Sequence, residues 1–296
     1  METESRSKMI YAIIAMTALC LVVISSCRQT PIEDVIVQLD THSLHAKVFG
    51  SGIPTVVVDV GLGGTIDEWF DFQNRLSERT TVVLYNRAGY GTSEPGPFPR
   101  DSRREMMELK EMLLRAKILG PYIIVGHSLG ALNAQVFADE YSSEVKGIVL
   151  LDPPPISWLL GEDFLELLDM ANRMTDEWKT ASQKLINSDN PKGRAQGLFL
   201  RTIASEQLEM TGSSARMVAE IQSYGNMPLV VIASEVPNPM FGEVAEEYQK
   251  YWIESSRELA HKSSEGKFIL AEGCTHRLHE EAFDTVIASV VEILER

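Results

Sequence analysis

Cysteine is scarce in this sequence, whose 296 residues include three. Cys20 and Cys27 lie within and just after an N-terminal apolar segment, so the body of the chain keeps Cys274 alone. A single thiol cannot form a disulfide within its own domain, which predicts a fold without structural disulfides. No group of His, Cys and Asp has metal-ligand spacing, and no phosphate-cradling G-x-x-x-x-G-K-[ST] motif occurs. We therefore expect neither a metal nor any other cofactor.

Positive charge is also in short supply. The chain has 27 Lys and Arg against 42 Asp and Glu, a formal net charge of −15. Phosphate groups repel such a surface, which argues against nucleic acid or an anionic lipid surface as a partner. The hydrophobic share of 44% and the charged share of 23% are typical of a soluble globular protein.

The N-terminus has the pattern of an export signal. Arg6 and Lys8 precede an uncharged, apolar stretch over residues 9–26, and small residues then lead to Cys27. A basic region, an apolar region and small residues before a cleavage site describe a secretory signal. The cysteine directly after them makes the segment resemble a bacterial lipoprotein signal, which implies lipid modification of Cys27.

Two alternatives to a lipoprotein stay open. The apolar run approaches the ~20 residues of a spanning helix, so it could be an uncleaved anchor, or it could be an ordinary cleaved signal. The lipoprotein and the uncleaved anchor both predict a protein exported to the cell envelope and tethered to a membrane by its N-terminus. Residues 1–30 are therefore treated as a targeting or anchor segment, and residues 31–296 as one domain.

Short β-rich runs alternate with longer helical patterns in that domain, which is typical of an α/β sheet. The first two runs are expected to pair antiparallel around Asp40-Thr41-His42. The run from Thr55 to Val60 is apolar up to Asp59, which suits a strand buried on both faces. Residues 61–65 follow it and are called the glycine-rich loop below. The predicted strands cover residues 35–39, 44–49, 55–60, 81–85, 122–125, 145–151, 229–233 and 267–271.

A segment of about 70 residues interrupts this alternation. Residues 153–226 show helical periodicity without a convincing strand, and they are too many for an ordinary loop. We expect a helical lid over the sheet. Its apolar residues could line an acyl pocket or simply pack onto the sheet; they are Trp158, Leu159, Leu160, Phe164, Leu167, Leu168, Met170, Met174 and Trp178.

The motif Gly126-His127-Ser128-Leu129-Gly130 carries the clearest chemical signal. A strand-like run precedes it, and a helical run over residues 129–140 follows it. This strand–turn–helix context is what a nucleophile elbow requires, because a sharp turn there exposes the serine hydroxyl. The first turn of the helix also offers free N–H groups to a developing oxyanion.

With this motif in place, residues 33–296 resemble the α/β-hydrolase superfamily, in its esterase- and lipase-like branch with a helical lid. The resemblance implies a mostly parallel, eight-stranded sheet with helices on both faces and a Ser-His-acid triad. It rests on the elbow and on four further stretches: Val58-Asp59-Val60-Gly61-Leu62-Gly63-Gly64, Tyr85-Asn86-Arg87-Ala88-Gly89-Tyr90-Gly91-Thr92-Ser93, Val149-Leu150-Leu151-Asp152-Pro153 and Ala271-Glu272-Gly273-Cys274-Thr275-His276.

The resemblance implies His276 as the general base, in the loop after the last predicted strand. His279, three residues later, is the alternative. The acid should stabilise the imidazolium and follow the serine in chain order. Asp152 after strand 145–151 is favoured, and Glu235 is the alternative because it follows the next strand, where an aspartate is commoner in the family.

The expected oxyanion hole combines the backbone N–H of Leu129 with one from the glycine-rich loop, taken to be that of Leu62. Arg87 and Tyr90 are expected to tie down the loop beneath the site. The predicted activity is hydrolysis of a carboxylic ester, a small-molecule acyl substrate, through an acyl-enzyme. A peptidase, a carbon–carbon bond hydrolase, and a tethered binding module without turnover are the alternatives, because a fold alone does not prove function.

Overall fold

The structure is a computed structural model that describes residues 33–296. The predictions for residues 1–30, including lipidation of Cys27, lie outside the described residues. Within residues 33–296, no helix combines the length and the apolar character needed to cross a membrane.

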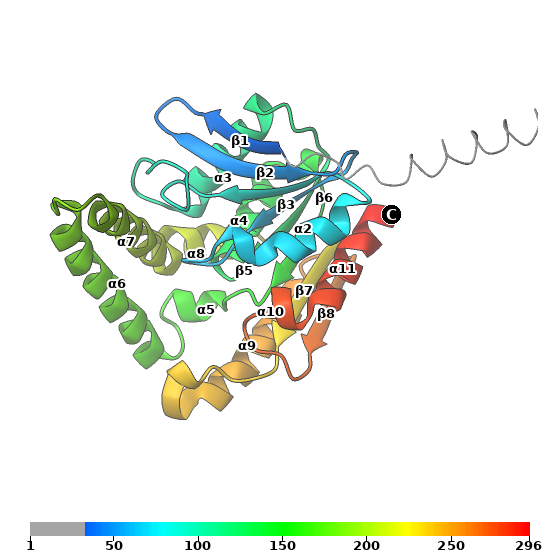
Figure 1. The fold of residues 1–296 in the computed structure, drawn as a ribbon. Helices are drawn as coiled ribbons and strands as arrows, with labels where there is room; N and C mark the ends of the chain where they lie inside the picture. Colours follow the sequence, from blue (N-terminus) through cyan, green and yellow to red (C-terminus); the bar gives the residue numbers. More distant parts are fainter. Residues whose placement is uncertain (1–32) are drawn as a thin grey trace, which may run out of the picture. The chain divides into compact units, whose positions relative to one another are not determined.

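A twisted eight-stranded sheet forms the centre of the described chain (Figure 1). The strands lie in the order β1-β2-β4-β3-β5-β6-β7-β8, so the chain crosses the sheet from one edge to the other and exchanges only β3 and β4 on the way. β1 and β2 pair antiparallel, as do β2 and β4, and the remaining neighbours pair parallel. The strands are β1 (Glu33–Gln38), β2 (Ser43–Phe49), β3 (Thr55–Asp59), β4 (Val82–Asn86), β5 (Tyr122–His127), β6 (Val145–Leu151), β7 (Leu229–Ser234) and β8 (Gly266–Ala271).

Parallel pairing brings the chemistry of distant segments to one edge of the sheet. β5 and β6 are in register from Gly126 opposite Leu150 to His127 opposite Leu151, so the residues after both strands emerge side by side. β7 and β8 continue the same edge. The loops after four neighbouring strands therefore meet above the carboxyl ends of the strands, where ligands bind in open α/β sheets.

Helices cover both faces of the sheet because its strands are apolar on both sides. On β5, Ile124 belongs to one core cluster, while Ile123 and Val125 belong to the other. One face packs against α3, α4 and α9, and the opposite face packs against α2 and α11. These helices are α2 (Phe70–Ser77), α3 (Ser102–Arg115), α4 (Leu129–Glu140), α9 (Ala245–Ala260) and α11 (Phe283–Glu295). The predicted mostly parallel eight-stranded sheet with helices on both faces is confirmed.

The segment of residues 153–226, here called the helical insert, contains helices and no strand of the sheet. Its longest helices form a hairpin, α6 and α7, that extends beside the sheet (Figure 1). Trp158, Leu159 and Leu167 are buried in the core cluster, so these three apolar side chains serve packing. The helices are α5 (Ile156–Leu159), α6 (Leu165–Ile186), α7 (Pro191–Glu209) and α8 (Ala215–Glu220), with a π-helical turn at Met210–Ser214.

Two helical segments are each broken in the structure. The segment after the glycine-rich loop consists of a 3-10 turn, Ile66–Trp69, and α2. The C-terminal helical segment is divided at Ala282 into α10 (Leu278–Glu281) and α11, because Ala282 leaves the helical conformation with φ −106° and ψ 27°.

Candidate active site

Ser128 occupies a strained turn between β5 and α4. Its φ of 55° and ψ of −116° are unusual for a residue with a side chain. Its N–H donates to the carbonyl of Leu151 at 3.0 Å, which ties the turn to β6. The flanking glycines permit the turn: a Cβ on Gly126 would lie 2.3 Å from the Gly130 oxygen, and one on Gly130 would lie 2.1 Å from the Asp59 oxygen.

His276 lies in the loop after β8, and a neighbour of Ser128 holds that loop in place. The Nε2–H of His127 donates to the carbonyl oxygen of His276 at 2.8 Å. The carbonyl of Cys274 accepts from the backbone N–H groups of Glu235 and Val236, at 3.1 and 3.0 Å. The histidine loop is thus fastened to the elbow on one side and to the loop after β7 on the other.

Asp152 is the carboxylate that meets His276. Its Oδ2 lies 2.6 Å from Nδ1 of His276. Ser234, at the end of β7, donates its backbone N–H to Oδ1 at 2.9 Å and its hydroxyl to Oδ2 at 2.8 Å. Asp152 is 2% exposed and has a φ of 49°, so a second strained residue aims its side chain at the site.

Glu235 and His279, the alternative acid and the alternative base, occupy other positions. The Oε2 atom of Glu235 accepts from the N–H of Gly273 at 2.8 Å, so this carboxylate braces the histidine loop instead of meeting the imidazole. His279 is buried beneath the site, where its ring stacks on Trp69 at 4.8 Å between centroids.

Ser128 and His276 line one cavity of about 260 Å³, together with residues 60–64. Gly61 of this lining lies close to the serine, since an added Cβ there would lie 3.4 Å from the Ser128 Cβ. Leu62 follows in the same loop, and Leu129 begins α4, whose first N–H groups lack partners within the helix. Leu62 therefore lines the same cavity as Ser128, and Leu129 follows the serine directly in the sequence.

Burial keeps the histidines behind the site neutral. Loss of hydration lowers the pKa of His127 well below its usual range, and the neighbouring His276 and His279 lower it further. The pKa of His279 is also lowered, chiefly by burial. A neutral His127 is consistent with its hydrogen bond to a carbonyl oxygen, which needs a proton on Nε2 alone.

A buried network of charged side chains lies directly beneath the glycine-rich loop. Arg87 is 1% exposed, and its Nη1 atom lies 2.5 Å from Oδ1 of Asp59. Its Nε donates at 3.0 Å to Oε1 of Glu206, which belongs to α7 in the helical insert. The sequence predicts that Arg87 and Tyr90 tie down the loop, but it gives no sign of Glu206, because no motif distinguishes that residue from other helical glutamates.

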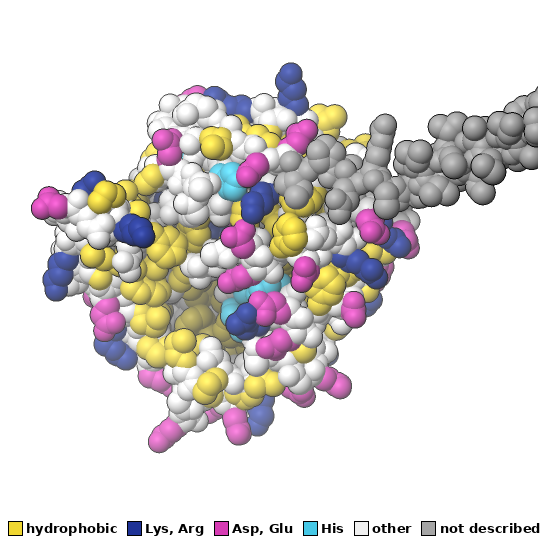
Figure 2. Space-filling model, in the orientation of Figure 1, with side chains coloured by type: hydrophobic (Ala, Val, Ile, Leu, Met, Phe, Trp, Pro, Cys, Tyr) yellow, Lys and Arg dark blue, Asp and Glu magenta, His cyan; other side chains and the backbone are white. Residues whose placement is uncertain are grey.

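A second cavity, of about 450 Å³, is also lined by His276 but by no residue of the glycine-rich loop. Asp152, Ser234 and Gln249 line its polar end. The Trp252 ring lies 5.9 Å from the His276 ring between centroids. The remaining wall is largely apolar and consists of Val236, Pro237, Pro239, Phe241 and Trp252 with Asn238 and Thr275. Figure 2 shows a hollow lined with hydrophobic side chains, with histidine visible beside it, on this face of the molecule.

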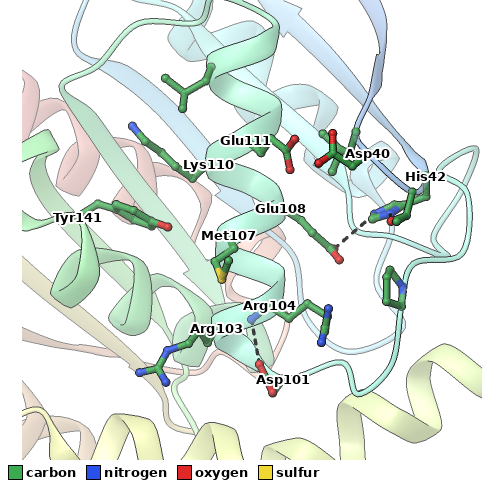
Figure 3. Close-up of a pocket in the computed structure, with 14 residues that line it drawn as sticks. Asp40, His42, Asp101, Arg103, Arg104, Met107, Glu108, Lys110, Glu111 and Tyr141 are labelled. Atoms are coloured by element: carbon green, nitrogen blue, oxygen red, sulfur yellow. Dashed lines mark hydrogen bonds and ion pairs between the residues drawn. The ribbon is translucent and has the colours of Figure 1, made fainter.

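A third cavity, of about 590 Å³, lies along α3 and contains none of the predicted site residues (Figure 3). Its wall is rich in charge, and Nε2 of His42 faces Oε2 of Glu108 at 3.6 Å. This groove lacks a strained serine beside a carboxylate-bound histidine. Among residues 33–296, no group of three His, Cys, Asp or Glu side chains is placed to hold a metal ion.

A family model described as the alpha/beta hydrolase fold matches residues 54–189, which include the elbow and β3 to β6. The chain has the α/β-hydrolase fold. A thermophilic esterase from Thermogutta terrifontis shares this fold with a TM-score of 0.65 and 16% identity, over 89% of this chain and 98% of that chain. At this level of identity the likeness concerns the fold alone.

Two curated relatives show sequence similarity to this hydrolase-fold chain. Uncharacterized protein YqjL of Bacillus subtilis (strain 168) is 24% identical over 254 residues, which cover 85% of this chain and 87% of that protein. The (lyso)-N-acylphosphatidylethanolamine lipase of Bos taurus is 32% identical over 103 residues, which cover 34% of this chain and 30% of that protein.

Proposed function

We propose that the protein is a serine hydrolase that cleaves carboxylic esters. Ser128 is the nucleophile, His276 the general base and Asp152 the acid that orients the base. One observation carries this proposal: the carboxylate-bound His276 is tied to His127, and it shares a cavity with the strained Ser128. The esterase and lipase activities named for the relatives and neighbours agree with this chemistry.

The proposed cycle has two acyl-transfer steps. Nε2 of His276 takes the hydroxyl proton as Oγ of Ser128 attacks the ester carbonyl, and the oxyanion that forms accepts from the N–H groups of Leu62 and Leu129. When the carbon–oxygen bond breaks, His276 gives its proton to the departing alkoxide. Water, deprotonated by the same histidine, then attacks the acyl-enzyme. As the bond to Oγ breaks, His276 returns the proton to Ser128 and the acid is released.

Asp152 is suited to orient His276 because both of its oxygens are occupied. The two bonds from Ser234 fix the carboxylate, and the remaining bond fixes Nδ1–H of the imidazole. Nε2 is then left without a proton and free to act as a base. Holding that tautomer and stabilising the imidazolium are the two tasks of a triad acid.

The acyl group of the substrate is proposed to occupy the largely apolar cavity of about 450 Å³ beside His276. Its volume lies within the usual range for small-molecule sites, and its apolar wall suits a short or medium hydrocarbon chain. The helical insert is proposed to act as a lid over this region, since its helix α5 packs next to Trp252 through Trp158, at 6.3 Å between ring centroids.

Tethering to a membrane is also part of the proposal, and it rests on the sequence of residues 1–30. A lipid on Cys27, or a retained apolar anchor, would hold the hydrolase domain at the surface of a membrane in the cell envelope.

Labelling with a fluorophosphonate tests the proposed activity. This reagent forms a covalent bond with an activated serine, so the native protein should be labelled and should release p-nitrophenol from p-nitrophenyl butyrate. Ser128→Ala should abolish both. The matched control is Ser157→Ala, which removes a hydroxyl outside the cavity of Ser128. A native protein that neither reacts nor turns over would instead support a tethered binding module.

A further inference from the structure

The helical insert sends one acidic side chain into the core beneath the glycine-rich loop. Glu206 on α7 is 1% exposed. Its Oε1 accepts from Nε of Arg87 at 3.0 Å, and its Oε2 accepts from the hydroxyl of Tyr90. The helix approaches the Arg87–Gly91 loop closely, since a Cβ on Gly89 would lie 2.4 Å from Oγ1 of Thr202. A buried ion pair this close demands fixed geometry, because neither charge can be solvated by water.

Arg87 connects Glu206 to the glycine-rich loop through two further hydrogen bonds. Its Nη1 donates to the carbonyl of Val60 at 2.6 Å, and its Nη2 donates to the carbonyl of Gly61 at 3.2 Å. The Gly61 carbonyl and the Leu62 N–H belong to one planar, trans peptide unit, in which they point in opposite directions. The Gly61 oxygen also accepts from the N–H of Gly64 at 3.1 Å, so the guanidinium and this turn together set the direction of the Leu62 N–H.

Tyr90 gives Glu206 a second route to the same loop. The N–H of Gly63 donates to the Tyr90 hydroxyl at 3.0 Å, and that hydroxyl donates to Glu206. The peptides on both sides of Leu62 are thus held by two side chains that share one carboxylate. The guanidinium is rigid and planar, so a partner at Nε fixes the orientation of the donors at Nη1 and Nη2.

The other buried acids near Arg87 do not duplicate this connection. Asp59 ends strand β3 and contacts Nη1, and it is also held by Tyr85 at 2.7 Å. Glu105 lies on α3, where its Oε2 accepts from Asn133 at 2.8 Å and lies 3.5 Å from Nε of Arg87. Burial, reinforced by the charge of Glu206, raises the pKa of Glu105 well above its usual range. Among these acids, Glu206 alone comes from the helical insert.

We propose that Glu206 is a positioning residue: through Arg87 and Tyr90, the helical insert holds the Leu62 N–H in the direction that receives the oxyanion. The inference rests on the proposed ester hydrolysis and extends it, because it makes the oxyanion hole depend on the seating of α7. Glu206 contacts no reacting atom. Its effect is therefore confined to the step in which negative charge develops on the carbonyl oxygen.

Glu206→Gln, assayed on p-nitrophenyl butyrate, tests this dependence. Full loss of an oxyanion-hole donor lowers kcat by roughly 10²–10³, so a misdirected donor should lower kcat about tenfold. KM should change by less than about twofold, because the ground-state carbonyl gains little from the hole. The inhibition constant of a trifluoromethyl ketone, which forms an oxyanion on Ser128, should rise in proportion to the loss in kcat/KM, while that of the product butyrate stays constant.

Ser205→Ala is the matched control. Ser205 precedes Glu206 on α7, and its Oγ also joins the helix to the body of the domain, by accepting from the N–H of Arg100 at 3.1 Å. This contact does not lead to the glycine-rich loop. Ser205→Ala should therefore keep kcat and the ketone inhibition constant within about twofold of the native values. An equal loss in both variants would overturn the proposal, because any loosening of α7 would then suffice.

Tyr90→Phe provides a second test that does not remove the buried charge. It should lower kcat with KM unchanged, and the double variant with Glu206→Gln should lose less than the product of the two single losses, because both act on one connection. If Glu206→Gln does not fold, Tyr90→Phe decides. Unchanged kcat in folded variants that still depend on Ser128 would overturn the positioning role alone, whereas a native protein without fluorophosphonate labelling would overturn the proposed function itself.

Discussion

His276 and Asp152 are joined by a 2.6 Å contact between Nδ1 and Oδ2, although 124 positions separate them in the sequence. Asp152 is 2% exposed, so its charge is withheld from water and directed at the imidazole and at Ser234. Such burial strengthens the electrostatic contact, because the surroundings screen it weakly. The relationship also separates the two candidate acids, since Glu235 reaches Gly273 instead.

Asp152→Asn should remove nearly all turnover, while Glu235→Gln should leave it close to native. An asparagine can offer its amide group to Nδ1 and favour the wrong tautomer, a change that costs about 10⁴ in kcat in serine proteases. The amide oxygen of a glutamine at position 235 can still accept from the N–H of Gly273, so kcat should stay within about twofold. Steady-state kinetics on p-nitrophenyl butyrate measure both. A larger loss in Glu235→Gln than in Asp152→Asn would contradict the assignment of the acid.

Filling the apolar cavity should shorten the preferred acyl chain. Val236→Phe adds volume to the wall beside His276, so an octanoyl chain loses contacts that an acetyl group never makes. Each methylene excluded from an apolar site costs about 0.8 kcal/mol, so kcat/KM for p-nitrophenyl octanoate should fall at least about tenfold. The acetyl ester is the internal control and should be hydrolysed at the native rate. Equal losses on both esters would place the acyl chain elsewhere.

Acid should destabilise the fold through His127. Burial lowers the pKa of His127 in the folded state well below the ordinary value of about 6.5. Below that pH the imidazole is therefore protonated in the unfolded chain but stays neutral in the folded chain. Stability rises with pH wherever the unfolded state binds more protons, so the free energy of unfolding should fall as the pH drops from 7 to 5.

The contribution of one such proton approaches about 1.4 kcal/mol per pH unit. His127→Gln should therefore show a shallower pH dependence than the native domain in urea unfolding at several pH values, whatever its absolute stability. Identical slopes in both proteins would show that another group causes the acid sensitivity.

Gly130→Ala should destabilise the domain and disable the elbow. The new Cβ would lie 2.1 Å from the Asp59 oxygen, so the turn or strand β3 has to shift. Overpacking of this kind costs about 1–3 kcal/mol, and thermal unfolding together with fluorophosphonate labelling would record both effects. Gly193→Ala is the control, because its neighbours are the flexible Ser188 and Asn190 side chains and its position in α7 favours alanine. A Gly130→Ala protein as stable and reactive as the control would argue against the tight elbow.

Lipidation predicts a specific dependence on Cys27. In cells fed labelled palmitate, the native protein should carry the label and partition into the detergent phase, because acyl chains supply the membrane affinity. Cys27→Ser should lose both properties, whereas Cys20→Ser, within the apolar segment, should keep them. Unlabelled native protein that still fractionates with membranes would favour a retained anchor over a lipid.

Local patterns predicted the elements with good accuracy where each segment carries its own signal. The helix over residues 129–140 and the strand over residues 145–151 have the predicted bounds. Both are apolar and largely buried, so the periodicity and length of the segment agree with its environment. The sharp elbow could also be predicted from the sequence, because only glycines at positions 126 and 130 let the backbone approach α4 and β3 so closely.

The residue types of the site, the alternation of strands and helices, and the helical insert could all be predicted from the sequence, because they depend on local spacing and size. Tertiary structure decided which carboxylate meets the histidine, since that choice depends on β6 lying beside β5 and on the direction in which Asp152 leaves its strand. It also decided the place of Glu206, an ordinary helical residue until α7 packs against Arg87 and removes both side chains from water.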